Sequence, residues 1–218
     1  MFSIESLSIS GYRGRSVPNT FFRRQEETQH LAVVLPGIRY TCQMPLLYYP
    51  TMLLLEEFGA NVLWVEYAYD KQPDFNALPG SEKEVWLFAD AGAACRAALA
   101  QRPYEEIALI GKSLGTLAME HLLTTEASLA EALAIWLTPL LKNDSLRAQI
   151  REREQRSLLV IGTEDPHYDP NYLEGVENLV LEGADHSLEI RGHPRQSLRA
   201  LEEVLQTIQT FVHAHRSP

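Results

Sequence analysis

The stretch Glu106–Gly115, EIALIGKSLG, joins an apolar run to a polar turn flanked by glycines. The run Ile107–Ile110 has the composition of a buried β-strand, and the residues from Leu114 onward have helical spacing. Two interpretations compete for the turn between them. The letters GKS occur in phosphate-binding loops, whereas G-x-S-x-G places a serine on a sharp turn between a strand and a helix. The choice between them decides the fold.

A phosphate-binding loop needs G-x-x-x-x-G-K-[ST], in which the first glycine lets backbone amides wrap the phosphates. In this register the first glycine would be residue 106, which is a glutamate, and residues 107–110 are apolar. A β-strand cannot form that cradle. We therefore interpret the turn as G-x-S-x-G, with Ser113 in a strained backbone conformation. The residues at positions 111 and 115 must then be very small, as Gly111 and Gly115 are, because larger side chains there would collide with neighbouring backbone.

Similar apolar runs recur from residue 30 onward and alternate with segments of helical periodicity. Runs without polar alternation are typical of strands buried on both faces, as in a parallel sheet. The expected strands are His30–Leu35, Asn61–Val65, Ile107–Ile110, Ala132–Leu137, Ser157–Ile161 and Asn178–Leu181. The expected helices are Pro45–Phe58, Glu82–Ala100, Leu114–Thr125, Asp144–Gln155 and Pro194–His213. This order predicts a doubly wound, mostly parallel α/β sheet flanked by helices.

The first 29 residues follow another pattern. Ser3–Ser10 alternates polar and apolar residues, and a second extended segment covers Val17–Arg24. We expect both to be edge strands of the same sheet. A chain of 218 residues suits one sizeable domain, and no linker, repeat or low-complexity tract divides it. Residues 1–218 are therefore expected to form a single domain.

Composition narrows the class of function. A hydrophobic fraction of 45% suits a globular core, and a formal net charge of −10 disfavours binding to nucleic acid or anionic lipid. No stretch approaches the roughly 18 apolar residues of a membrane span, and the N-terminus lacks a signal-peptide pattern. Cys42 and Cys95 have no metal-ligand spacing and are expected to be reduced, mostly buried thiols. These features predict a cytoplasmic protein without a metal.

A nucleophilic serine needs a base, and the base needs an acid that orients it. Asp165 follows the expected strand that ends at Ile161, and His186 follows the strand that ends at Leu181. The carboxyl ends of parallel strands meet at one edge of a sheet, where α/β proteins build their sites. We therefore expect Ser113, Asp165 and His186 to come together, in the chain order typical of this kind of serine turn.

Other residues compete for these roles. The rivals are Asp144 and Asp169 for the acid, and His121, His167 and His193 for the base. His167 shares a loop with Asp165 and is expected to point elsewhere. Asp185 adjoins His186, but consecutive side chains usually diverge. We therefore expect the Asp185 side chain to face solvent rather than to be the acid that orients His186. Ser113 has the alternative role of a helix N-cap.

Together these motifs resemble the α/β-hydrolase superfamily, and in particular its short, dienelactone-hydrolase-like members with little or no cap. The resemblance runs from about Leu31 to the C-terminus and rests on LPG after the first buried strand, GKSLG, GTEDP and GADHS. It implies an α/β-hydrolase fold and a hydrolase of carboxylic esters or thioesters that needs no cofactor. In that reaction Ser113 is the nucleophile, His186 the base and Asp165 the acid, and the substrate is a small or extended acyl compound.

The resemblance also implies an oxyanion hole made of two backbone amides. One is the amide of Leu114, and the other is that of Ile38, with Arg39 as the alternative. Pro36 stands where many relatives carry a histidine. Loops that converge above the sheet supply further candidates for the pocket, namely Arg39, Tyr40, Tyr67 and Tyr69.

Several alternatives stay open. Lys112 either attracts an acidic substrate or pairs with a carboxylate beneath the loop, and the structural role is favoured. Only about one helix fits between Trp136 and Ser157, so an open, shallow pocket is expected rather than a lid. The alternative functions are a non-catalytic module that binds a ligand or a protein, and a small serine peptidase or amidase. The sequence carries no prediction of oligomeric state.

Overall fold

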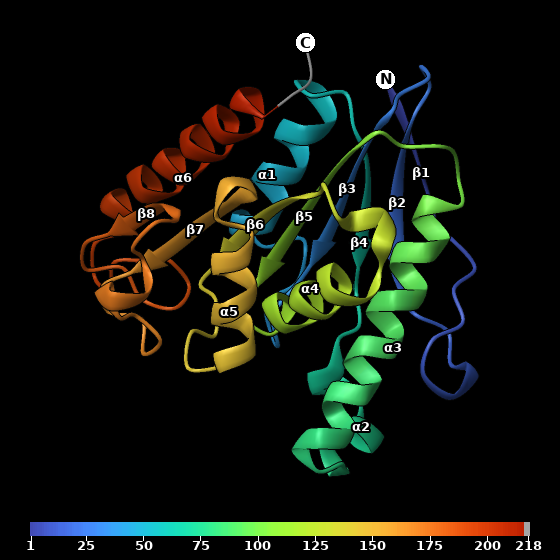
Figure 1. Ribbon diagram of the computed structural model, residues 1–218, viewed down its shortest axis with the longest axis horizontal. Coiled ribbons are helices and arrows are strands. Elements are labelled where there is room, and N and C mark those ends of the chain that lie inside the picture. The colour runs from blue at the N-terminus through green and yellow to red at the C-terminus, as the bar shows by residue number, and fades with distance from the viewer. Residues whose placement is uncertain (216–218) are drawn as a thin grey trace.

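Eight strands form one sheet in the computed structural model of this protein, which describes residues 1–215 (Figure 1). The strands are β1 (Phe2–Glu5), β2 (Asn19–Arg24), β3 (His30–Leu35), β4 (Asn61–Val65), β5 (Glu106–Lys112), β6 (Leu133–Leu137), β7 (Ser157–Gly162) and β8 (Glu177–Leu181). Their order across the sheet is β1-β2-β4-β3-β5-β6-β7-β8. Strands β3 to β8 pair in parallel, and β2 pairs antiparallel with both β1 and β4. The predicted doubly wound, mostly parallel sheet is confirmed.

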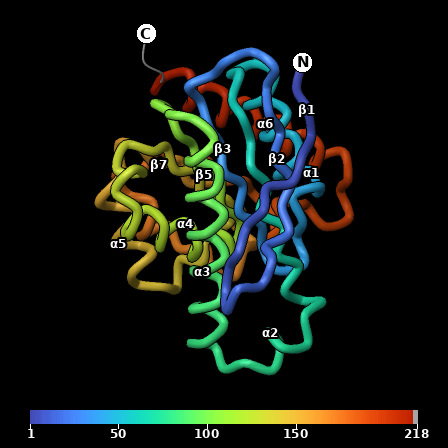
Figure 2. The backbone as a smooth tube through the Cα atoms, turned by 90° about the vertical axis from the view of Figure 1, so that its right-hand side faces the viewer, coloured from blue at the N-terminus to red at the C-terminus, as the bar shows by residue number. Residues whose placement is uncertain are grey.

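Helices cover both faces of this sheet. They are α1 (Pro45–Glu56), α2 (Pro73–Ala77), α3 (Gly80–Leu99), α4 (Leu114–Thr125), α5 (Asp144–Glu152) and α6 (Pro194–Ala214). Helices α1 and α6 pack on one face, and α3, α4 and α5 pack on the other, with the sheet between the two layers (Figure 2). Within residues 1–215, no helix has the length and apolar composition that crossing a membrane requires.

The apolar runs form strands because both of their faces are buried. In β3, Leu31, Val33 and Leu35 face the core beneath α3 and α4, whereas Ala32 and Val34 face the core beneath α1 and α6. Successive side chains of a strand point to opposite faces, so a strand between two helical layers needs apolar residues at every position. The absence of polar alternation in the sequence has this cause.

The N-terminal segment differs from the expected strand over Ser3–Ser10. Strand β1 ends at Glu5, and the chain then leaves the sheet. The side chain of Asn19 accepts a hydrogen bond from the Leu7 amide at 2.9 Å and donates one to the Leu7 carbonyl at 2.8 Å. A side chain therefore takes the place of a ladder partner, and the strand cannot continue. The expectation of a strand as far as Ser10 was wrong for this reason.

Helix α5 also ends earlier than the expected Gln155. Arg153 leaves the helical conformation, and a short 3₁₀ turn, Glu154–Arg156, leads into β7. The Arg153 guanidinium donates to the carbonyls of Ala130 and Ala132, both at 2.7 Å. These contacts tie the end of α5 to the segment before β6. Between β6 and β7 the chain thus carries only one helix and this turn, so no lid covers the edge of the sheet.

Candidate active site

Ser113 lies on a strained turn between β5 and α4. Its backbone angles are φ 52° and ψ −116°, and its amide donates to the Leu137 carbonyl at 3.0 Å. A Cβ atom on Gly115 would lie 1.9 Å from the Leu35 carbonyl oxygen, and one on Gly111 would lie 2.8 Å from the Gly115 oxygen. Both positions therefore require glycine. Ser113 occupies the N-cap position of α4, but its side chain makes no capping hydrogen bond to that helix.

Ser113, His186 and Asp165 form one chain of hydrogen bonds. The Nε2 atom of His186 lies 2.8 Å from the Ser113 hydroxyl, and its Nδ1 atom lies 2.7 Å from Asp165 Oδ2. The Asp165 carboxylate is fully buried, whereas about a third of the His186 side chain is exposed. A carboxylate on Nδ1 fixes the proton there, which leaves Nε2 free to accept the proton of the serine hydroxyl.

The loops that carry Asp165 and His186 are joined to each other. The Thr163 hydroxyl accepts from the Gly183 amide at 2.8 Å, and the Glu164 amide donates to the Ala184 carbonyl at 3.0 Å. A Cβ atom on Gly162 would lie 2.0 Å from that same carbonyl oxygen. Glycine at the end of β7 therefore lets the two loops touch, and their contact sets the distance between Asp165 and His186.

The rival acids lie in other surroundings. Asp144 is exposed and pairs with Arg147 one turn along α5. The Asp169 carboxylate accepts from the Asn171 amide at 2.9 Å and stabilises its own turn. The loop after β8, which carries His186, is called the histidine loop below. The Asp185 carboxylate stabilises this loop, because it accepts from the Ser187 amide at 2.8 Å.

The rival histidines are not bonded to the serine hydroxyl either. His121 stacks on Phe88 with ring centroids 4.2 Å apart, and His193 is exposed ahead of α6. His167 lies closer, with its ring 5.8 Å from that of His186, and its amide donates to Asp165 Oδ1 at 2.8 Å. Burial lowers the pKa of His167. This neighbour of the hydrogen-bonded chain has no sequence signal beyond its place in the acid's loop.

The loop after β3 lies directly against the serine. A Cβ atom on Gly37 would lie 3.1 Å from the Ser113 Cβ, so glycine permits this approach. Arg39 has a left-handed backbone, with φ 60°, which turns the loop. Among residues 1–215, neither the Ile38 amide nor the Leu114 amide donates to another group. Neither N–H group is therefore already engaged.

The aromatic candidates separate into two groups. Tyr67 and Tyr69 are each only 2% exposed and stack with ring centroids 4.6 Å apart. The Tyr69 hydroxyl donates to Asp90 at 2.8 Å. The expectation that these two residues line a pocket needs correction, because both face the core. Tyr40 is half-buried and Arg39 is exposed, so these two remain at the edge of the site.

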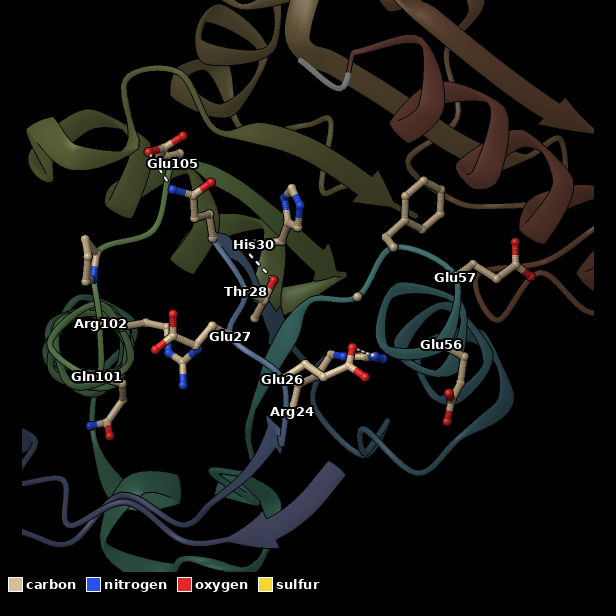
Figure 3. A pocket seen from close by; sticks show the side chains of 14 residues that line it. Arg24, Glu26, Glu27, Thr28, His30, Glu56, Glu57, Gln101, Arg102 and Glu105 are labelled. Atoms are coloured by element: carbon tan, nitrogen blue, oxygen red, sulfur yellow. Dashed lines mark hydrogen bonds and ion pairs between the residues drawn. The ribbon is translucent and has the colours of Figure 1, made fainter. Parts of the chain in front are cut away.

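One cavity lies far from this arrangement. It has a volume of about 940 Å³ and lies at the amino ends of β3 and β5, the edge of the sheet opposite Ser113 (Figure 3). Its labelled polar side chains are Arg24, Glu26, Glu27, Thr28, His30, Glu56, Glu57, Gln101, Arg102 and Glu105. Three of the carboxylates are already engaged, Glu26 by Arg24 at 3.3 Å, Glu57 by Gln209 at 2.5 Å and Glu105 by Gln29 at 2.8 Å. Among residues 1–215, no serine or cysteine lines this cavity.

A second, mostly apolar cavity adjoins the histidine loop. Its volume is about 330 Å³, and its walls are formed by the loop after β3, the histidine loop and the first turns of α1 and α6. The lining includes Tyr40, Leu46, Ser187, Leu188 and Leu198. Ser187, which directly follows His186 in the chain, lines this cavity, whereas Ser113, Asp165 and His186 do not.

Side chains that could bind a metal are not grouped together in the described part of the chain. Within residues 1–215, no three histidine, cysteine, aspartate or glutamate side chains are arranged to hold a metal ion. Cys42 and Cys95 are buried free thiols, as expected. Burial raises the pKa of Cys95 to about 12 and that of Cys42 well above its ordinary value, so both stay protonated.

Comparison with known proteins identifies the fold. No protein-family model and no curated protein matches the sequence. The chain is similar to a lidless α/β serine hydrolase of Xanthomonas campestris, at 16% identity with a TM-score of 0.67, covering 99% of this chain and 97% of that one. It is similar to a dienelactone hydrolase of Anabaena variabilis, at 15% identity with a TM-score of 0.71 and 98% of both chains covered. An esterase of Pyrococcus furiosus has 14% identity and a TM-score of 0.69, with 99% and 92% covered. The chain therefore has the α/β-hydrolase fold without a lid, as the resemblance implied.

Proposed function

We propose that this protein is a serine hydrolase that cleaves a carboxylic ester or thioester through an acyl-enzyme. The observation that carries the proposal is the hydrogen-bonded chain from Ser113 through His186 to Asp165, on a turn that presents the serine hydroxyl. A helix N-cap or a surface serine would not need a strained backbone and a fully buried carboxylate behind an imidazole. The fold neighbours, which include esterases, agree with this chemistry.

In the first half of the reaction, Ser113 Oγ attacks the carbonyl carbon while His186 Nε2 takes its proton. The buried Asp165 carboxylate stabilises the imidazolium that forms. The amides of Leu114 and Ile38 donate to the oxygen that becomes negative. The imidazolium then returns its proton to the leaving alcohol or thiol, and the acyl group stays on Ser113.

The second half repeats these roles with water. His186 removes a proton from the water molecule, which attacks the acyl carbonyl, and the same two amides hold the oxyanion. Collapse of the intermediate returns the proton to Ser113 Oγ and releases the carboxylic acid. The chain's own groups supply every proton transfer in this sequence.

The substrate class follows from the surroundings of Ser113. With only α5 and a 3₁₀ turn between β6 and β7, the edge of the sheet is open. The mostly apolar cavity beside the histidine loop favours an uncharged acyl compound over a phosphorylated one. A carboxylesterase or thioesterase acting on a small or extended acyl compound is thus the leading function, and a cytoplasmic location remains a prediction.

A fluorophosphonate probe and p-nitrophenyl acetate together test this proposal. We expect the wild-type protein to be labelled by the probe and to hydrolyse the ester, because both reactions need an activated serine. Ser113→Ala should prevent labelling and lower kcat by about 10⁴-fold or more. The matched control is Ser145→Ala on the exposed face of α5, whose hydroxyl bonds only to Glu120, at 2.8 Å. This variant should behave like the wild type.

Other results would favour the alternatives. Equal labelling of Ser113→Ala and of the wild type would show that Ser113 is not the nucleophile. A folded wild-type protein that neither reacts with the probe nor turns over any ester or thioester would favour a binding module. Faster cleavage of an amide than of the matching ester would favour a peptidase or amidase.

A further inference from the structure

Lys112 occupies an unusual place for a charged residue. It is the last residue of β5 and the x that precedes the serine in the G-x-S-x-G turn, and it is only 2% exposed. Burying an ammonium group costs several kcal/mol unless its hydrogen bonds are replaced. The contacts that this side chain makes therefore indicate why a lysine is present.

The ammonium group holds the histidine loop. Lys112 Nζ donates to the backbone carbonyl of His186 at 3.0 Å. This residue carries the imidazole that bonds to Ser113, so the lysine fixes the backbone from which the imidazole projects. The Asp185 carboxylate braces the same loop through the Ser187 amide.

The same side chain also contacts the loop after β3. Lys112 Nζ lies 4.8 Å from the centroid of the Tyr40 ring, within the range of a cation–π interaction. A Cβ atom on Gly37 would lie 3.4 Å from Lys112 Cδ, so the lysine stem packs along that loop. The Tyr40 hydroxyl in turn accepts from the Leu46 amide of α1 at 3.1 Å. One lysine therefore touches both loops that meet at Ser113.

Charged groups around Lys112 favour its ammonium form. Asp165 from the loop after β7 and Asp185 from the histidine loop both attract it, although burial has the larger effect. The net result lowers the pKa of Lys112 to about 8. On the remaining side, burial raises the pKa of Tyr40 to about 12, so the ring stays neutral, and Glu189 adds to this effect. Lys112 is thus charged at pH 7 and neutral above about pH 8.

We propose that Lys112 is a positioning residue, whose ammonium group holds the histidine loop and the loop after β3 in register on either side of Ser113. It does not touch the reacting atoms, and its burial leaves no room for it to bind an acidic substrate. The catalytic consequence rests on the proposed hydrolase function, whereas the structural consequence for His186 does not.

Steady-state kinetics of Lys112→Met and Lys112→Arg test the catalytic consequence. We expect Lys112→Met to lower kcat by about 100-fold at unchanged KM, because misplacing a reacting group by about 1 Å costs about that much. Lys112→Arg, which keeps the charge and the donor, should retain most of the activity. The wild-type kcat should fall as pH rises through about 8, because a neutral amine binds the carbonyl and the ring more weakly. Lys112→Met should lack this fall. The proposal would be overturned if Lys112→Met had the same kcat as the wild type, or if its kcat fell with pH as that of the wild type does.

A measurement without substrate tests the structural consequence. The proton between His186 Nδ1 and Asp165 should give a low-field proton NMR signal in the wild type. We expect this signal to broaden or disappear in Lys112→Met, provided that its melting curve shows a folded protein. The exposed Lys71→Met is the matched control and should leave the signal unchanged.

The two tests separate the two hypotheses. A perturbed signal in Lys112→Met together with a wild type that hydrolyses no ester would uphold the positioning role and reject the proposed function. An unchanged signal and unchanged kcat in Lys112→Met, with activity lost in Ser113→Ala, would reject the positioning role alone.

Discussion

At the residue scale, the site depends on glycines, which have no side chain, as much as on Ser113 itself. Ser113 holds a backbone conformation that costs on the order of 1–3 kcal/mol. It is kept there because Gly115 lets the turn approach the Leu35 carbonyl and Gly37 lets the next loop approach Ser113 itself. Glycine at these positions permits close backbone packing, and this packing holds the Ser113 hydroxyl in a fixed orientation.

Lys112 should make the stability of this protein depend on pH in a defined window. Below about pH 8 the lysine is charged in both the folded and the unfolded chain, and above pH 10.5 it is neutral in both. Between these values the unfolded chain holds the extra proton, so the free energy of unfolding rises with pH. A pKa lowered from 10.5 to about 8 corresponds to about 3 kcal/mol.

Urea unfolding of the wild type and Lys112→Met at pH 7 and pH 11 measures this effect. Other titrating groups act equally on both proteins and cancel in the difference. We expect the wild type to gain about 3 kcal/mol relative to the variant over this range. A difference between the two proteins that does not change with pH would contradict the assignment of this titration to Lys112.

At the scale of elements, Asp90 joins α3 to two segments that are remote in sequence. Its carboxylate accepts from the Tyr12 amide at 2.8 Å, the Tyr69 hydroxyl at 2.8 Å and the Trp86 indole at 2.9 Å. Burial raises the pKa of Asp90 above its ordinary value, while these three donors oppose the rise. The turn at Gly11 fits against the same carboxylate, because a Cβ atom there would lie 2.1 Å from it.

Asp90→Ala should therefore be strongly destabilising. It leaves three buried or half-buried donors without a partner, so we expect the free energy of unfolding to fall by about 3 kcal/mol or more in urea titrations. The control is Asp74→Ala, whose exposed carboxylate pairs with Arg15 at 2.5 Å on the surface. Such surface pairs contribute about 0–1 kcal/mol. Equal losses in the two variants would show that the Asp90 hydrogen bonds do not anchor these segments.

At the scale of the whole molecule, one sheet serves two cores. Strand β2 places Phe21 in the core beneath α3 and α4 and Phe22 in the core beneath α1 and α6. The apolar residues of β3 to β7 alternate between the two cores in the same way, so neither helical layer keeps its core without the other. The edge strands β1 and β2 extend this shared sheet beyond β4.

We therefore predict that the chain unfolds as a single domain. Differential scanning calorimetry should give one transition, with a calorimetric enthalpy equal to the van't Hoff enthalpy. Its heat-capacity change should be about 3 kcal/mol/K for a chain of 218 residues. Two resolved transitions, or melting of the first 29 residues ahead of the rest, would contradict this prediction.

The sequence was most informative where a local rule applies. Ile107–Ile110 is apolar at every position because it lies between two cores, and Leu114–Thr125 was predicted with the bounds that α4 has. The turn between them follows from glycine spacing alone. Asp165 and His186 could be named because each follows an apolar run that forms a strand, and the fold brings both beside Ser113. Their catalytic roles remain a prediction.

Other features were decided only by tertiary structure. The side chains of Tyr67 and Tyr69 turn into the core, where each is 2% exposed, although their loop leaves the same edge of the sheet as Ser113. The end of β1 is set by Asn19, which is distant in sequence from Leu7. Likewise, the hydrogen bond from Lys112 to His186 joins two segments far apart in the chain.

The sequence by itself thus determined the α/β order and the sharp turn at Ser113, and it named Asp165 and His186 as the expected partners of that serine. These depend on apolar periodicity and on glycine spacing, which operate over a few neighbouring positions. Only the tertiary structure decided which side chains are buried, which polar groups find partners and how Lys112 joins two loops. Such contacts form between segments remote in sequence, so no local pattern encodes them, and the packing of both cores selects them together.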